Sequence, residues 1–208
     1  MSVISASAVK ELREMSGAGM MDCKNALKEA SGNLEEAIDI LRKSGIAKAR
    51  KKSGRSAKEG LIFPYIHPGS KLGVLLEINC ETDFVANTDD FKDLSKDIAM
   101  HIAASAPMAI NREEIPQEVL DREKEIYAEQ ARQSGKPENI IEKMIEGRLN
   151  KFYQENVLME QAFVKDPDKT VQDMLTETVA KLGENILITR FVRYQLGESA
   201  GNSDPSNN

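Results

Sequence analysis

The chain has 208 residues, of which 34 are acidic and 28 basic, so its formal net charge is −6. This length suits one well-built core, or a small module beside a main domain. The acidic balance argues against a protein that binds nucleic acid over its whole surface. No apolar run reaches the roughly 18 residues of a membrane helix, and the first residues lack the charged start and apolar stretch of a signal peptide. We therefore expect a cytoplasmic protein.

The sulfur and imidazole side chains offer little material for metal or redox chemistry. Cys23 and Cys80 are too far apart in the sequence to form a metal-binding motif. Free, mostly buried thiols in a reducing compartment are the simplest interpretation. His67 precedes a Pro-Gly turn and His101 falls on a predicted helix, so we expect structural roles for both.

Residues 1–45 predict a module of three short helices. The first helix should end at the glycines around residue 18, and Gly32 suits the end of the second. Asn33 is a suitable N-cap for the third helix, with Glu36 three residues later. The apolar stripe of that helix consists of Leu34, Ala37, Ile38 and Leu41. We expect Gly45 to end it.

Residues 46–60 are expected to form a basic linker. The stretch 42–58 has eight basic residues and no acidic one: Arg42, Lys43, Lys48, Arg50, Lys51, Lys52, Arg55 and Lys58. The other 20 basic residues face all 34 acidic ones, so the rest of the chain has a charge of −14. The stretch is either a solvated connector or a contact to an acidic protein surface or RNA phosphates. No aromatic residue is interleaved with the charges, so base stacking is not supported.

Residues 61–80 predict a β-hairpin, because apolar residues alternate along 72–80 after a turn at 67–70. Residues 88–182 are mostly helical in pattern, with a loop expected at 166–168, and residues 186–196 predict a third strand. The expected fold class is α+β: a three-helix module, then a three-stranded antiparallel sheet packed with helices on one face. The polar tail 198–208 is expected to be disordered.

The connection 81–87 between the second strand and the next helix is the most informative stretch. Phe84 lies there between Asp83 and Val85. Connections of this kind lie on the surface and often carry function, although most phenylalanines are buried. Phe84 is therefore either a core residue that closes the sheet or an exposed wedge for another protein.

Recognisable catalytic motifs are missing from the sequence. It has no glycine-rich phosphate loop, zinc motif, nucleophile elbow or kinase signature. The carboxylates of 81–90 make a divalent-cation site, and hence a metal-dependent hydrolase, conceivable. The pattern favours a binding protein over an enzyme, with no cofactor and no metal of its own.

Two stretches resemble the signatures of the elongation factor Ts family. One is Ser16–Lys24 (SGAGMMDCK), preceded by Val9–Arg13 (VKELR), and the other is Glu77–Asn87 (EINCETDFVAN). Gly183–Ile186 (GENI) also matches the family near its last strand. The resemblance implies that residues 1–45 form a module like the ubiquitin-associated fold. Residues 61–197 would form the α+β core for dimerisation and nucleotide exchange.

The same resemblance implies a guanine-nucleotide exchange factor for elongation factor Tu, in which no covalent chemistry occurs. The N-terminal module would dock on the nucleotide-binding domain of that GTPase through Lys10, Arg13, Met20, Met21 and Lys24. The residues expected to dislodge the partner's Mg²⁺, and so to release GDP, are Thr82, Asp83, Phe84 and Val85. Short family members imply a homodimer and a two-plus-two complex, with no membrane and no direct nucleic-acid binding required. An RNA- or ribosome-associated protein acting through 42–58 stays open as the second hypothesis.

Overall fold

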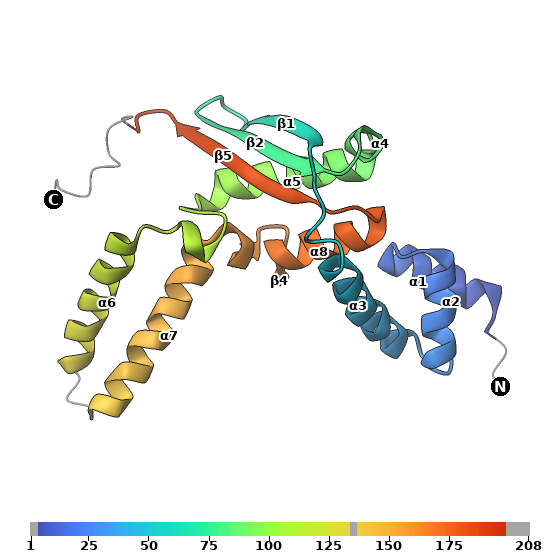
Figure 1. Cartoon of the computed structure of the whole chain (residues 1–208), viewed down its shortest axis with the longest axis horizontal. Helices are drawn as coiled ribbons and strands as arrows, with labels where there is room; N and C mark the ends of the chain where they lie inside the picture. The colour runs from blue at the N-terminus through green and yellow to red at the C-terminus, as the bar shows by residue number, and fades with distance from the viewer. Residues whose placement is uncertain (1–3, 134–136, 199–208) are drawn as a thin grey trace. The chain divides into compact units, whose positions relative to one another are not determined.

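The structure is a computed structural model that describes residues 4–133 and 137–198 (Figure 1). The chain forms two compact units. The first consists of Met1–Ile62, Glu77–Ser95 and Asp173–Thr189, and the second of Phe63–Leu76, Lys96–Gln172 and Arg190–Asn208. The expected disordered tail lies, from residue 199 onwards, outside the described residues. Within the described ranges, no helix is both long and apolar enough to cross a membrane.

The first unit begins with three helices: α1 (Ala6–Ser16), α2 (Met20–Glu29) and α3 (Leu34–Arg50). The side chain of Asn33 accepts hydrogen bonds from the backbone N–H groups of Glu35 and Glu36, as expected of an N-cap. The three helices share one small apolar core, formed by Val9, Leu12, Cys23, Ala26, Leu27, Ala30 and Ala37. Their packing explains why helices this short are stable.

The expected end of the third helix at Gly45 is wrong, because α3 continues to Arg50. A glycine inside a helix costs only about 1 kcal/mol relative to alanine, and the alanines that follow favour helix. Gly45 also faces α8 (Val171–Leu182), where a Cβ on residue 45 would lie 3.4 Å from the Cβ of Ala180. The small residue therefore permits close packing of two helices, and the first part of the expected linker 46–60 is helical. Whether 45/46 is a domain boundary stays a prediction.

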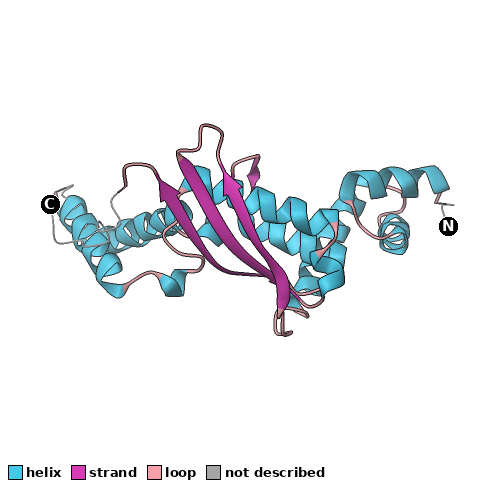
Figure 2. Ribbon diagram, turned by 90° about the horizontal axis from the view of Figure 1, so that it is seen from above, coloured by secondary structure: helices cyan, strands magenta, loops and turns pink. Residues whose placement is uncertain are grey.

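The predicted sheet is confirmed. Strands β1 (Glu59–Ile66), β2 (Leu72–Cys80) and β5 (Leu187–Gln195) form one antiparallel sheet in the order β1-β2-β5 (Figure 2). Every second residue of β2 is buried, from Val74 to Cys80, which is the alternation that predicted the strand. The guanidinium of Arg193 on β5 donates to the carbonyl of Ala103 on the helix α5 (Asp89–Ser105), so helices pack on this sheet.

The expected loop at 166–168 is also wrong. Residues Asp166–Thr170 form a strand, β4, that pairs antiparallel with β3 (Ala162–Phe163). Proline and aspartate are poor strand residues, but Pro167 is tolerated here because the hairpin is short and irregular in register. Two further helices of the second unit, α6 (Gln117–Arg132) and α7 (Glu138–Asn156), pack against each other. Short 3₁₀ turns at Arg112–Glu114 and Leu158–Glu160 complete the connections.

The buried polar groups of the second unit are paired. His101 on α5 is fully buried, and its Nε2 lies 2.9 Å from Oε1 of Gln161. The backbone N–H of Val164 donates to Nδ1 of the same ring at 3.3 Å. This contact requires a lone pair on Nδ1, so the proton is on Nε2 and is donated to Gln161. Burial lowers the pKa of His101 below its usual value of 6.5, consistent with a structural, neutral imidazole.

Candidate functional site

The connection after β2 contains a four-residue helix, α4 (Asp83–Ala86), that presents Phe84 to solvent. The side chain of Phe84 is 81% exposed, the largest exposed fraction among the large apolar residues of the described chain. Ala86 is buried and Val85 half-buried, so these two side chains attach the helix to the rest of the first unit. The interpretation of Phe84 as a core residue is therefore wrong, and its exposure is confirmed.

Side chains cap both ends of α4. At the start, the hydroxyl oxygen of Thr82 accepts from the backbone N–H of Val85 at 3.4 Å. At the end, the amide of Asn87 donates to the carbonyl of Asp83 at 2.9 Å. The hydroxyl of Thr88 donates to the carbonyl of Val85 at 2.7 Å. A single helical turn has little stability of its own, so these capping bonds hold the backbone under Phe84.

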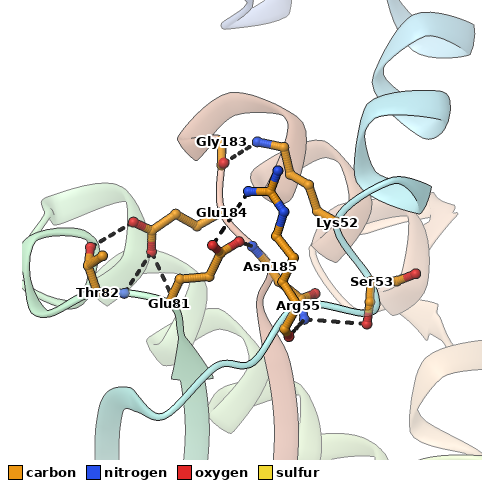
Figure 3. Close-up of polar contacts among 8 residues, drawn as sticks. All are labelled: Lys52, Ser53, Arg55, Glu81, Thr82, Gly183, Glu184 and Asn185. Carbon is orange, nitrogen blue, oxygen red and sulfur yellow. Dashed lines mark hydrogen bonds and ion pairs between the residues drawn. The ribbon is translucent and has the colours of Figure 1, made fainter.

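A polar network ties the start of α4 to the turn between α8 and β5 (Figure 3). The carboxylate of Glu184 accepts three hydrogen bonds: from the backbone N–H of Glu81 at 3.1 Å, the backbone N–H of Thr82 at 3.0 Å and the hydroxyl of Thr82 at 2.6 Å. In return, the carboxylate of Glu81 accepts from the backbone N–H of Asn185 at 2.7 Å. The two connections, about 100 residues apart in sequence, are thus joined reciprocally.

The same turn holds the segment after α3. The side-chain amide of Asn185 donates to the carbonyls of Arg55, at 2.8 Å, and Ser53, at 3.4 Å (Figure 3). The ammonium of Lys52 donates to the carbonyl of Gly183, and Arg55 pairs with the carboxylate of Glu81 at 3.5 Å. The expected linker is therefore attached to the core at 52–55. Two of its cations have internal partners here.

Some of the carboxylates around α4 have partners of their own. Glu81 is engaged as described, and Asp90 pairs with Lys181 on α8 at 2.6 Å. Asp83 and Asp89 are exposed on the first turns of their helices, where a negative charge stabilises the helix dipole. In the part of the chain that the structure describes, no group of three or more acidic, histidine or cysteine side chains is placed to hold a metal ion.

Cys80 lies at the end of β2, directly before this site, and is buried with a free thiol, as is Cys23. Both match the expectation from sequence. Burial, and then the nearby charge of Glu184, raise the pKa of Cys80 to about 11. Its thiol donates to the carbonyl of Thr82 at 3.1 Å. It is a protonated structural group that adds another contact to the 81–82 backbone.

The five candidate residues of the N-terminal module are all at the surface. Lys10 and Arg13 lie three positions apart on α1, and Met20 and Lys24 lie four apart on α2, so each pair shares a helix face. Met20 is 47% and Met21 64% exposed. Core packing therefore does not account for either methionine. Lys10 forms a solvent-exposed pair with Glu14 at 3.7 Å, which costs little to break.

Sequence reasoning located the 82–85 segment but missed the residues that support it. The sequence places Glu184 and Asn185 in a family-like stretch and indicates no role for either. Polar residues placed directly after Gly183 and before an apolar strand were the available signal. Their partners are about 100 residues away, so no local pattern predicts the contact.

Comparison with known proteins identifies the family of this chain. A family model described as Elongation factor TS matches residues 2–198. The chain is 61% identical over 196 residues to a protein named elongation factor Ts from Thermoanaerobacter sp. (strain X514), covering 94% of this chain and 96% of that protein. It is 62% identical to proteins of the same name from Fervidobacterium nodosum and Geobacter sulfurreducens, covering 94% of this chain and 99% and 90% of theirs. The chain therefore belongs to the elongation factor Ts family.

Proposed function

We propose that this elongation factor promotes the release of GDP from elongation factor Tu, and that the segment Thr82–Val85 is the part that acts on the partner's nucleotide site. Membership of the family supports the partner and the process. The observation that carries the residue assignment is Phe84, which is 81% exposed on a short helix capped at both ends. A large aromatic held in solvent on a fixed backbone is typical of an interface anchor.

The mechanism follows from how a GTPase holds its nucleotide. Mg²⁺ bridges phosphate oxygens and protein oxygens in such sites, and it neutralises much of the phosphate charge. Phe84 enters the partner beside its nucleotide-binding domain and shifts the elements that order the metal's ligands. Asp83, next to it and exposed, brings a negative charge that opposes the phosphates. Loss of the metal removes a large favourable electrostatic interaction, and GDP leaves faster.

The two binding events are coupled. If the exchange factor lowers the affinity of the partner for GDP by a given factor, GDP lowers the affinity for the exchange factor by the same factor. Each 1.4 kcal/mol of coupling changes the affinity about tenfold. If the rate of GDP association is unchanged, a coupling of several kcal/mol accelerates release by orders of magnitude. No bond of either protein is made or broken, so the factor acts without cofactor or covalent intermediate.

The N-terminal module supplies the second contact in this proposal. Lys10, Arg13, Met20, Met21 and Lys24 bind the nucleotide-binding domain, and their exposure supports this role. Methionine side chains adapt to irregular apolar surfaces, and the lysines and arginine complement an acidic one. Holding the partner at the module raises the effective concentration of α4 at the nucleotide site.

The test is stopped-flow release of a fluorescent GDP from elongation factor Tu, at a factor concentration below saturation. Burying about 140 Å² of the Phe84 side chain at about 25 cal/mol per Å² is worth about 3.5 kcal/mol. We therefore expect Phe84→Ala to slow the stimulated release by about two orders of magnitude. Met108→Ala, which removes another exposed large apolar side chain, is the control and should change nothing. An unchanged rate in Phe84→Ala would show that the segment does not act as a wedge.

We further propose that the protein is a homodimer, which gives a two-plus-two complex with the partner. The support is a set of exposed apolar side chains on or beside the strands of the second unit: Ile66, Leu75, Val192, Tyr194 and Leu196. Exposed strand edges and apolar sheet residues are normally covered. Sedimentation at micromolar concentration should give the mass of two chains, and Tyr194→Asp should give one. A monomer in the wild type at that concentration refutes the dimer.

A further inference from the structure

The carboxylate of Glu184 is the link between α4 and a distant part of the first unit. Its two oxygens accept from two successive backbone N–H groups and from the hydroxyl of Thr82, at 2.6 to 3.1 Å (Figure 3). Three donors converge on one charged acceptor, and hydrogen bonds to an ionised group are the strong ones. Neither the end of α8 nor the start of β5 requires these three contacts from the side chain of Glu184.

The bonds form a chain that ends inside α4. The backbone N–H of Val85 donates to the hydroxyl oxygen of Thr82, and that hydroxyl donates its own proton to Glu184. Glu184 therefore decides the direction in which the Thr82 lone pairs point. Linked hydrogen bonds of this kind strengthen one another in a partly buried setting. A change at residue 184 is transmitted to the first turn of α4, which carries Phe84.

We propose that Glu184 is a positioning residue of the exchange site, which holds α4 and Phe84 in the binding orientation before the partner arrives. The inference rests on the proposed role of Phe84. The physical reason is preorganisation: when only a fraction of molecules has the competent conformation, the apparent dissociation constant rises by the inverse of that fraction. Without the carboxylate, this four-residue helix keeps its local caps, the Cys80 contact and the packing of Ala86, but loses its hydrogen bonds to the turn at residue 184.

Glu184→Gln is the informative substitution because it keeps the size and shape of the side chain. Its carboxamide NH₂ donates and cannot accept. If the NH₂ faces the backbone N–H groups of 81–82, donor meets donor. If it faces the hydroxyl of Thr82, that oxygen must accept from residue 184 and can no longer donate to it. We expect the stimulated GDP release at subsaturating factor to fall about tenfold or more. The control Glu142→Gln makes the same charge change at an exposed position on α7 and should leave the rate unchanged.

A double-mutant cycle separates positioning from a general structural role. If Glu184 acts through Phe84, the double variant Phe84→Ala with Glu184→Gln releases GDP as slowly as Phe84→Ala alone. If the two losses multiply, Glu184 acts elsewhere and the inference is wrong. Thr82→Val, which removes the hydroxyl's bond to Glu184 together with its cap on the N–H of Val85, should show a loss in the same direction. It keeps the test decisive if Glu184→Gln does not fold.

A second arm needs no partner and so does not depend on the proposed function. The chain has no tryptophan, so Phe84→Trp introduces a single tryptophan, which can be excited separately from the tyrosines, at an 81% exposed position on α4. Time-resolved anisotropy should show a larger amplitude of fast local motion when Glu184→Gln is added, and an unchanged amplitude with Glu142→Gln. Equal local motion in both backgrounds overturns the inference. If Glu184→Gln raises the local mobility but Phe84→Ala still stimulates GDP release at the normal rate, the proposed function is wrong and the positioning contact is supported.

Discussion

Gly60, on the edge strand β1, should not tolerate even one additional methyl group. Its φ is +141°, a region that side chains rarely adopt. A Cβ at this position would overlap the carbonyl oxygen of Ile78 and would lie 2.7 Å from the Cα of Asn79, both on β2. These neighbours are backbone atoms of the central strand and have no rotamer to change. Gly60→Ala must therefore strain the backbone or separate β1 from β2.

The cost can be placed within an order of magnitude. Holding a residue with a side chain at such a φ costs about 1–3 kcal/mol, and forcing an extra carbon into a packed site costs about 1–3 kcal/mol more. A total of about 4 kcal/mol is a large part of the 5–15 kcal/mol that stabilises a typical domain. With a denaturant slope of about 2 kcal/mol per molar urea, the unfolding midpoint should fall by about 2 M.

Urea unfolding followed by circular dichroism measures this shift. The matched control is Gly54→Ala, since a Cβ there meets no atom within 4 Å and the φ of Gly54 is ordinary. That substitution should be neutral or stabilise by up to about 1 kcal/mol, because it restricts the unfolded chain. A Gly60→Ala midpoint within about 0.3 M of the wild type would refute the reasoning, whatever the control does.

Three further predictions concern single residues. Gly147, inside α7, has open space where a Cβ would be, so Gly147→Ala should stabilise by about 0.5–1 kcal/mol. A thermal midpoint that falls would contradict this. Burial lowers the pKa of His101 below 6.5, so the unfolded chain binds that proton more tightly and the free energy of unfolding falls as pH drops below this value. His101→Asn should weaken this pH dependence of the free energy of unfolding between about pH 7 and pH 5.5. Urea midpoints measured at both pH values test this, and the same difference in wild type and variant would contradict it. Cys80, with a pKa raised to about 11, should stay unmodified by iodoacetamide at about pH 8 in a Cys23→Ser background. Rapid loss of the free thiol in mass spectra would show that the site is open.

Patterns of residues a few positions apart predict most of the local structure of this chain. Glycine breaks, the Asn33 cap and the apolar stripe of the third helix predicted the N-terminal helices, and strict alternation predicted β2. The stretch 81–87 was recognised as the candidate site because it follows that strand and resembles a family signature. These inferences succeed because helix periodicity, strand alternation and capping each depend on residues a few positions apart.

Tertiary contacts decided the rest. The local pattern predicted a helix end at Gly45, but α3 continues through this residue, where the missing side chain permits close packing beside Ala180. The strand at Asp166–Thr170 depends on a partner strand that propensity does not reveal. Pattern left two readings of Phe84, and only the folded chain showed the exposed one. Glu184 had no role in sequence because its three donors are about 100 residues away. Such contacts arise when the chain closes on itself, and no local pattern specifies which residues then meet.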